Sequence, residues 1–373
     1  MEPTLADFVH TDFMKNPTDK KIAEKVLAAE RITAEDALYL YTTAELGFLA
    51  MLANHIKHNK NGKNVYFIQN IHLEPTNVCV CNCRFCSYAK KKGTEGAWEL
   101  SLDEIAEKIH QIDACVNEIH ITGGTHPSAT VSSYVDMVKT IRAINPHIHI
   151  KAFSAAELHY VFTKEDIPYQ EGFRLLIAAG LGSIPGGGAE IFDETLRRKI
   201  CPDKTSSVEW LRVHEASHQS GIFSNATMLY GHIETYEHRI DHMNRLRNLQ
   251  DNTSGFNAFI PLKFKRQNNP MSNIKEGTLL EDLRNYAVAR VFLDNFPHIK
   301  SYWPMLGKEA AQLSLSFGVD DIDGTINDST KIYSMAGAED TAPHMNVYEI
   351  KKLITAAGQN PVERYSDYSA VIV

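Results

Sequence analysis

The sequence predicts an α/β protein whose main part is a parallel (β/α)8 barrel of the TIM type, preceded by a helical extension. Between residues 65 and 326, short apolar segments alternate with segments of helical period, about eight times in all. No G-x-G-x-x-G follows the first apolar segment, which disfavours the alternative of an open doubly wound sheet. The residues most suited to chemistry come directly after the apolar segments, where a parallel barrel carries its active-site loops.

Both ends of the chain are expected to be helical. In residues 1–60, apolar residues recur every three and four positions, and a turn near Gly62 ends this N-terminal layer. The barrel is expected to fill residues 61–340. In the remaining segment, 341–373, the stretch VYEIKKLITAAG has helical spacing and a terminal glycine, which predict a helix packed on the barrel.

Within the barrel, strands and helices are expected to alternate. Ser101, followed three residues later by Glu104, forms a capping-box pattern that marks the start of the first barrel helix. The expected strands are 65–75, 118–122, 147–154, 182–188 (a strand end and loop), 223–231, 256–264, 299–303 and 321–326. The expected helices are 101–115, 131–144, 171–179, 206–221, 237–250, 280–295 and 307–318.

Composition excludes several classes of protein. The net charge of −8, with no dominant basic patch, argues against a nucleic-acid partner. No apolar run is long enough for a membrane span, and the first residues lack the apolar region of a signal peptide. The expected location is the cytoplasm, where thiols stay reduced and clustered cysteines indicate metal or redox chemistry.

Four of the six cysteines fall within the stretch NVCVCNCRFCSYAK, residues 77–90. Cys83 and Cys86 form a C-x-x-C, which alone would suit half a zinc site or a redox pair. With Cys79 they give C-x-x-x-C-x-x-C, and three thiolates in a short loop can hold three irons of a cubane cluster. The fourth iron would stay open for a small chelating ligand. The sequence contains no second cysteine cluster, so we expect no auxiliary iron–sulfur centre.

This loop, placed directly after the first strand, resembles that of the radical S-adenosylmethionine superfamily. The resemblance implies one 4Fe–4S cluster held by Cys79, Cys83 and Cys86, whose open iron takes the amino and carboxylate groups of S-adenosylmethionine. Phe85 matches the superfamily loop, and Phe85 and Tyr88 are expected beside the cofactors. Cys81 is expected to face away from the cluster as a bystander.

Two later loops extend the resemblance. Gly123 and Gly124, in GGTHP, resemble the glycine pair that meets the methionine amino group, since glycine lets backbone approach a ligand closely. Ser154 and Glu157, in AFSAAE, are the further candidates for cofactor binding, with the Glu157 carboxylate accepting from ribose hydroxyls. The alternative for Glu157 is a carboxylate that stabilises the N-terminus of a helix.

Four longer stretches resemble one branch of the superfamily, which contains the futalosine-pathway enzymes of menaquinone biosynthesis and the second subunit of FO synthase. They are GLGSIPGGGAEIFDETLRRKICP, NATMLYGHIET, LRNLQDNTSGFNAFIPLKFKRQNNP and GVDDIDGTI. Over residues 60–340 the sequence is most similar to the aminodeoxyfutalosine synthases. Cys81 and Thr125 depart from the commoner spellings of the branch.

The resemblance implies a transferase reaction. A 5′-deoxyadenosyl radical adds to the enol ether of 3-[(1-carboxyvinyl)oxy]benzoate, and rearrangement with loss of the carboxylate gives 6-amino-6-deoxyfutalosine. S-adenosylmethionine is then a co-substrate, and an electron donor such as flavodoxin or ferredoxin is required. The alternatives are the dehypoxanthine futalosine cyclase, an FO-synthase-type subunit, or a non-catalytic metal-binding module.

The substrate of this reaction is a dicarboxylate, so its pocket needs donors aimed at anions. The candidate substrate-binding residues at predicted strand ends are His126, His232, Lys263 and Arg266. The candidate catalytic residues are His126, Tyr230 and Asn225, with the Tyr230 ring placed to stack on the substrate. Asp320, Asp321 and Asp323 are expected to be helix caps and turn residues rather than metal ligands.

Overall fold

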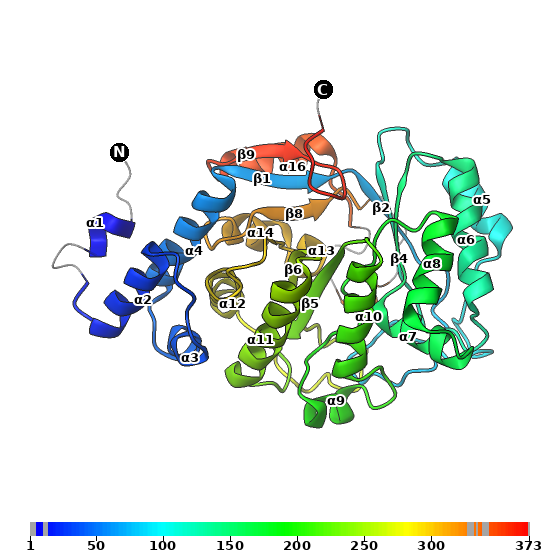
Figure 1. The fold of residues 1–373 in the computed structure, drawn as a ribbon, viewed down its shortest axis with the longest axis horizontal. Coiled ribbons are helices and arrows are strands. Elements are labelled where there is room, and N and C mark those ends of the chain that lie inside the picture. The colour runs from blue at the N-terminus through cyan, green and yellow to red at the C-terminus, as the bar shows by residue number, and fades with distance from the viewer. Residues whose placement is uncertain (1–4, 10–13, 327–331, 333–334, 338–342, 372–373) are drawn as a thin grey trace.

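The computed structural model describes residues 5–9, 14–326, 332, 335–337 and 343–371 (Figure 1). Its N-terminal helices lie together at one end of the molecule, where α4 packs on α12. The Thr33 hydroxyl and the Asp36 carboxylate form a capping box at the start of α3, and Gly62, with φ of 59°, ends α4. These helices are α1 (Leu5–Val9), α2 (Pro17–Leu27), α3 (Ala34–Thr42) and α4 (Leu46–Asn61).

The predicted barrel is confirmed. Every strand pairing of the ring is parallel, in the runs β2-β3-β4, β5-β6-β7 and β8-β1. Single parallel bridges join these runs. Residues 183–184 take the place of the fourth barrel strand, with one bridge to Lys151 of β4 and one to Ser224 of β5, and Lys300 bridges to Asp321 of β8. Only Gln69 separates β1 from β2, so the runs close into one ring. The strands are β1 (Asn64–Ile68), β2 (Asn70–Leu73), β3 (Glu118–Ile121), β4 (His149–Ala152), β5 (Ser224–Tyr230), β6 (Phe256–Lys263), β7 (His298–Ile299) and β8 (Asp321–Gly324).

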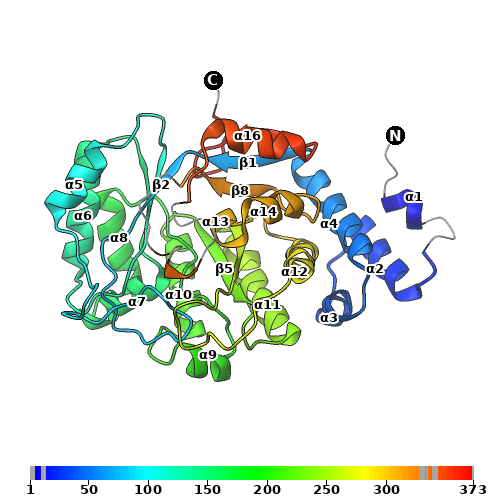
Figure 2. The same ribbon diagram turned by 180° about the vertical axis from the view of Figure 1, so that it is seen from behind.

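Helices cover the outside of this ring (Figure 2). The capping box of Ser101 and Glu104 is present at the start of α5, as the sequence predicts. The remaining helices are α5 (Leu102–His110), α6 (Val131–Ile144), α7 (Ala155–Lys164), α8 (Tyr169–Ala179), α9 (Glu194–Ile200), α10 (Ser207–Gln219), α11 (Tyr236–Thr253), α12 (Leu279–Phe292), α13 (Trp303–Leu306), α14 (Lys308–Ser314) and α16 (Val347–Ala356). Among the described residues, none of these helices combines the length and apolar character needed to cross a membrane.

Strand side chains alternate between the helices and the interior of the ring. Ile119 and Ile121 of β3 belong to the buried apolar core. The residue between them, His120, contacts the ring of His72 on β2, with 4.6 Å between centroids. His72, His120 and Lys151 are direct partners across the three strands. The interior of the barrel is therefore polar at this level, with the apolar residues turned outward.

The C-terminal segment does more than pack a helix on the barrel. After α16, strand β9 (Asn360–Glu363) pairs in parallel with β1, with Asn64 opposite Asn360. The chain then crosses the N-terminal ends of the strands, where Ser366 donates to Glu118 at 2.7 Å and the Tyr368 ring stacks on His298 at 3.8 Å. This segment closes the end of the barrel opposite the active-site loops.

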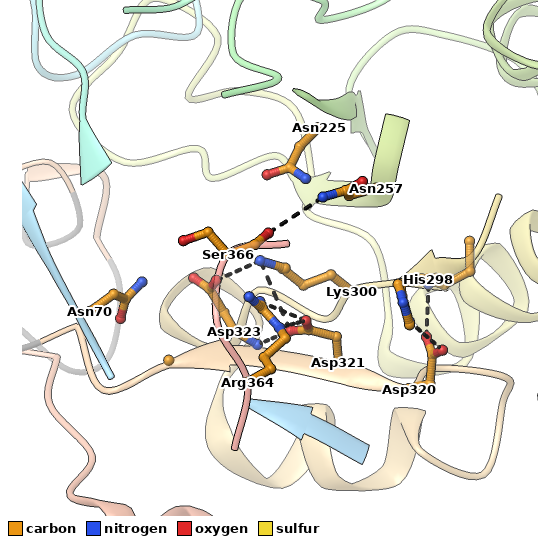
Figure 3. Close-up of polar contacts among 12 residues, drawn as sticks. Asn70, Asn225, Asn257, His298, Lys300, Asp320, Asp321, Asp323, Arg364 and Ser366 are labelled. Carbon is orange, nitrogen blue, oxygen red and sulfur yellow. Dashed lines mark hydrogen bonds and ion pairs between the residues drawn. The ribbon is translucent and has the colours of Figure 1, made fainter. Parts of the chain in front are cut away.

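The three aspartates near the last barrel strand are buried partners of cations, so the expectation of helix caps and turn residues is wrong. Arg290 donates to Asp320 at 2.7 Å. Figure 3 shows the other two, with Arg364 donating to Asp321 at 2.8 Å and Lys300 to Asp323 at 2.8 Å. In and beside a strand that is buried all round, such carboxylates need paired cations.

Candidate active site

The loop that follows β2 carries the cysteines and is held from two sides. The Cys79 amide donates to the Lys90 carbonyl at 2.9 Å, and the Val80 amide donates to the Thr125 carbonyl at 2.9 Å. The Lys91 ammonium donates to the carbonyls of Cys79, Val80 and Cys81 at 3.1, 2.9 and 3.4 Å. One exposed lysine thus gathers three consecutive carbonyls of the cysteine loop.

Gly123 and Gly124 bring the loop after β3 against this cysteine loop. The Gly124 amide donates to the Thr76 carbonyl at 2.8 Å. A Cβ on Gly124 would lie 2.3 Å from the Val78 oxygen, and one on Gly123 would lie 2.7 Å from the Thr76 oxygen. Both contacts are shorter than any side chain tolerates, so the two loops need glycine to pack at this distance. The glycine pair therefore has a structural cause in addition to the ligand contact that the sequence suggests.

The Cys81 thiol does not face away as expected. It is buried and donates to the Asp203 carbonyl at 3.6 Å, and it lies near enough to the thiols of Cys79 and Cys83 to act on their pKa values. The contact with Cys81 lowers the pKa of Cys79 to about 5 and lowers the pKa of Cys83, whereas burial raises the pKa of Cys86. Cys81 therefore belongs to the thiol group of the loop, although the spacing assigns it no iron.

Cys79, Cys83 and Cys86 are the residues of this loop that would hold a cubane cluster. All are free thiols that are partly exposed, and the Cys86 amide donates to the Cys83 carbonyl at 3.1 Å within one turn. Among the described residues, no three His, Cys, Asp or Glu side chains converge on one ion. A cubane does not require such convergence, because each thiolate binds a different iron. We therefore assign the cluster to Cys79, Cys83 and Cys86 as a proposal.

The candidate cofactor residues around the loop are all buried or nearly so. Ser154 caps α7, and the Glu157 carboxylate accepts from the Ser154 amide at 2.8 Å and from its hydroxyl at 2.6 Å. Burial raises the pKa of Glu157 to about 7. The Tyr88 hydroxyl donates to the Thr76 carbonyl at 3.1 Å, and the Lys204 ammonium lies 5.7 Å from the centre of the Phe85 ring. The helix-capping alternative for Glu157 is thus present, and its ribose contact stays a prediction.

His126 is the one candidate substrate residue that borders a cavity near the glycine pair. This cavity of about 270 Å³ is also lined by Gly123, Gly124 and Glu157. The His126 Nδ1 accepts from the Ser128 amide at 3.1 Å, and its Nε2 lies 3.2 Å from Glu99. The cavity opens between the loops and helices α5 and α6, outside the interior of the barrel.

The other candidates do not meet in one place. Tyr230 and Lys263 both turn outward to Asp282 of α12, at 2.9 and 2.6 Å, so neither faces the barrel interior. His232 is buried against Glu234, and Arg266 is exposed. Asn225 faces the interior near Asn257 (Figure 3). The structure therefore does not support Tyr230 stacking on a substrate in the interior of the barrel.

Sequence reasoning missed the charged and imidazole side chains of the barrel interior. They are His72, His120, Lys151 and Lys300. The signal was available in IHL, IHI, IKA and IKS, where one polar residue interrupts an apolar strand. In a strand buried on both faces, a polar residue with apolar neighbours marks the face turned away from the helices.

Comparison with known proteins bears on this site. Residues 73–246 match the Radical SAM superfamily, and residues 253–372 match the CofH/MqnC C-terminal region. An aminodeoxyfutalosine synthase of Thermus thermophilus is 44% identical over 365 residues, which cover 96% of this chain and 98% of the relative. The chain belongs to the radical S-adenosylmethionine superfamily. As a member, it is an enzyme that uses a 4Fe–4S cluster and S-adenosylmethionine.

One further sequence relative and one solved structure are also similar to this chain. A cyclic dehypoxanthine futalosine synthase of Streptomyces coelicolor is 36% identical, over 94% of this chain and 88% of the relative. The crystal structure of methylornithine synthase superposes with a TM-score of 0.73 at 16% identity, covering 91% of this chain and 97% of the other. The structural likeness supports the barrel fold alone, whereas the sequence relatives narrow the branch to the futalosine enzymes and their neighbours.

Proposed function

We propose that this radical S-adenosylmethionine enzyme is an aminodeoxyfutalosine synthase. The observation that carries the proposal is the 44% identity to such a synthase, extending over 96% of the chain. In Streptomyces coelicolor the identity is 37% to the synthase and 36% to the futalosine-pathway cyclase. The stretches GAEIFDETLRRKICP and NATMLYGHIET also favour the synthase over the cyclase.

In the proposed reaction, S-adenosylmethionine and 3-[(1-carboxyvinyl)oxy]benzoate are joined. A 4Fe–4S cluster held by Cys79, Cys83 and Cys86 would supply one electron for the cleavage of S-adenosylmethionine into methionine and a 5′-deoxyadenosyl radical. This radical would form a carbon–carbon bond to the enol ether, and the later loss of the carboxylate would return the electron. Rearrangement and loss of one carboxylate, as carbon dioxide or bicarbonate, give 6-amino-6-deoxyfutalosine. Methionine is the second product, and the adenosyl group remains in the first.

The chain's own residues have three tasks in this reaction. Cys79, Cys83 and Cys86 hold three irons, and the loop of Gly123 fixes the position of the cysteine loop. Glu157, which is buried with the charge of Cys79 acting on it, has the task of accepting from hydroxyl groups of the adenosyl ribose. Burial raises its pKa to about 7, and the carboxyl group retains acceptor capacity in both protonation states.

The second candidate is the hydrogen-abstracting cyclase or an FO-synthase-type subunit, which the match to the CofH/MqnC C-terminal region favours. Both candidates share the barrel and the cluster, so only the product separates them. In the cyclase reading, the adenosyl group leaves as free 5′-deoxyadenosine and does not enter the product.

The test is an anaerobic incubation with reconstituted iron and sulfide, a reductant, S-adenosylmethionine and the benzoate, followed by mass spectrometry. We expect an adduct that contains the adenosyl group and lacks one carboxylate. Free 5′-deoxyadenosine with untouched benzoate would assign the chain to the second candidate. Serine variants of Cys79, Cys83 and Cys86 are the controls without a cluster, whereas Cys81→Ser should retain one; a colourless Cys81→Ser would show that the three ligands are assigned wrongly.

A further inference from the structure

The interior of the barrel contains a layer of polar side chains near the C-terminal ends of β2, β3 and β4. His72, His120 and Lys151 lie side by side on β2, β3 and β4, and each is one residue from the end of its strand. Lys300 follows β7 and reaches the same interior, where burial and the nearby charges of Lys300 and Lys151 act on His72. Four strand ends around the ring thus direct hydrogen-bond donors into one space.

The two lysines keep donors for a further partner. The Lys151 ammonium donates to Glu118 at 2.6 Å, and the Lys300 ammonium donates to Asp323 at 2.8 Å. Each ammonium carries three N–H groups. Both side chains are about 95% buried or more, so an additional acceptor must come from the interior itself. A carboxylate is the acceptor that binds buried ammonium groups most strongly.

The imidazoles add adaptable donors to the same layer. Burial lowers the pKa of His72 to about 4, and burial together with His72 and Lys151 lowers the pKa of His120. Both rings are therefore neutral beside the two ammonium groups. An anion bound next to the two imidazoles favours their protonated forms. The positive charge gained in this way offsets the charge of the anion, because the charges of the lysines are already balanced by their carboxylate partners.

Apolar side chains and an aromatic ring border the layer. Because the Lys263 side chain turns to Asp282 of α12, the alternate residues Ile260 and Leu262 face the interior. Both are only partly buried, and so is His120, although all three belong to strands covered by helices. Tyr302 lies parallel to His72 at 6.3 Å. An accessible space with an apolar wall and cationic donors matches a benzoate group.

We infer that the layer of His72, His120, Lys151 and Lys300 binds the aromatic carboxylate of the substrate, with the benzene ring against Ile260 and Leu262. The inference rests on the proposed function and names the part of the site that holds the substrate. The enol ether must meet the radical at the mouth, beside the cysteine loop. The aromatic carboxylate is the opposite end of the molecule, and it lies one layer deeper.

The test compares two ligands on two variants, using the holoenzyme. The ligands are 3-[(1-carboxyvinyl)oxy]benzoate and its analogue with a carboxamide in place of the aromatic carboxylate. One variant is His120→Leu. The other combines Lys151→Met with Glu118→Gln, which removes the ammonium and its paired charge together. We expect the dissociation constant of the benzoate to rise at least about tenfold in both variants, and that of the carboxamide to change less than about twofold.

Folding and scaffold effects are controlled in parallel. Lys25→Met with Asp36→Asn removes an ion pair of 2.5 Å between α2 and α3, away from the barrel interior, and should leave both constants unchanged. Cluster absorbance and S-adenosylmethionine binding report whether each variant is intact. If both ligands lost affinity equally in the variants, or neither lost any, the inference would be overturned. Turnover of the benzoate by the wild-type enzyme would still uphold the proposed function in that case. Wild-type enzyme that neither binds nor consumes the benzoate would overturn both.

Discussion

Replacing Lys91 by methionine should loosen the cysteine loop without changing the barrel. In the structure its ammonium donates to the carbonyls of Cys79, Val80 and Cys81. Methionine keeps most of the apolar length of the side chain and removes all three hydrogen bonds. The loop would then depend on its backbone contacts alone.

The size of the effect follows from these three bonds. Hydrogen bonds to a charged donor contribute about 1.5–3 kcal/mol each when buried, but the Lys91 ammonium is exposed and competes with water. The loss of side-chain rotamer freedom opposes them further. We expect a net loss of about 1–2 kcal/mol in loop closure, which corresponds to about 5–30-fold more frequent opening.

The assay is the rate at which the cluster absorbance disappears under a chelator, in the absence of oxygen. The Lys91→Met variant should bleach about 5–30 times faster than the wild type, with an unchanged far-ultraviolet circular dichroism spectrum. Lys92→Met is the matched control, because it removes the same charge from the exposed neighbouring residue. Equal bleaching rates in the two variants would refute the reasoning, since charge alone would then explain the result.

Three further predictions test other parts of the structure. Gly124→Ala should prevent cluster incorporation, because its Cβ would lie 2.3 Å from the Val78 oxygen; iron analysis of a folded variant with full cluster content would contradict this. Arg364→Met should lower the free energy of unfolding by about 3–5 kcal/mol in urea, because Asp321 would keep a buried charge without that cation. Without S-adenosylmethionine, stability should fall as pH rises from about 4.5 to about 7, because Glu157 has its pKa raised to about 7 and the unfolded chain loses that proton first. Glu157→Gln should reduce this slope, and parallel profiles would exclude the assigned cause.

The sequence was sufficient for the architecture and for the cysteine loop. The alternation of apolar and amphipathic segments predicted the ring, and the pattern at Ser101 and Glu104 predicted a helix start that the structure contains. Such features depend on neighbours a few residues apart. The C-x-x-x-C-x-x-C spacing is of the same local kind, and for that reason it could be read directly.

The side chains that line the barrel interior were harder to predict. In a strand that is buried on both faces, the sequence does not show which side chains point to the helices and which point to the interior. Tyr230 and Lys263 are at a strand end, as expected, but they turn outward to Asp282. A shift of one residue would have placed them inside. His120 and Lys151, in contrast, lie within predicted strands, and their apolar neighbours indicate an inward position.

The pairing of β9 with β1 constrains how the molecule forms during its synthesis. Asn64 leaves the ribosome long before its partner Asn360, because the two residues are far apart in the sequence. Arg364, which neutralises Asp321, emerges later still. The end of the barrel that the C-terminal segment closes is therefore completed only after all eight strands of the ring have been synthesised, and contacts so distant in sequence form slowly. A chain truncated before β9 would expose an unpaired edge of β1 and present it to chaperones or proteases.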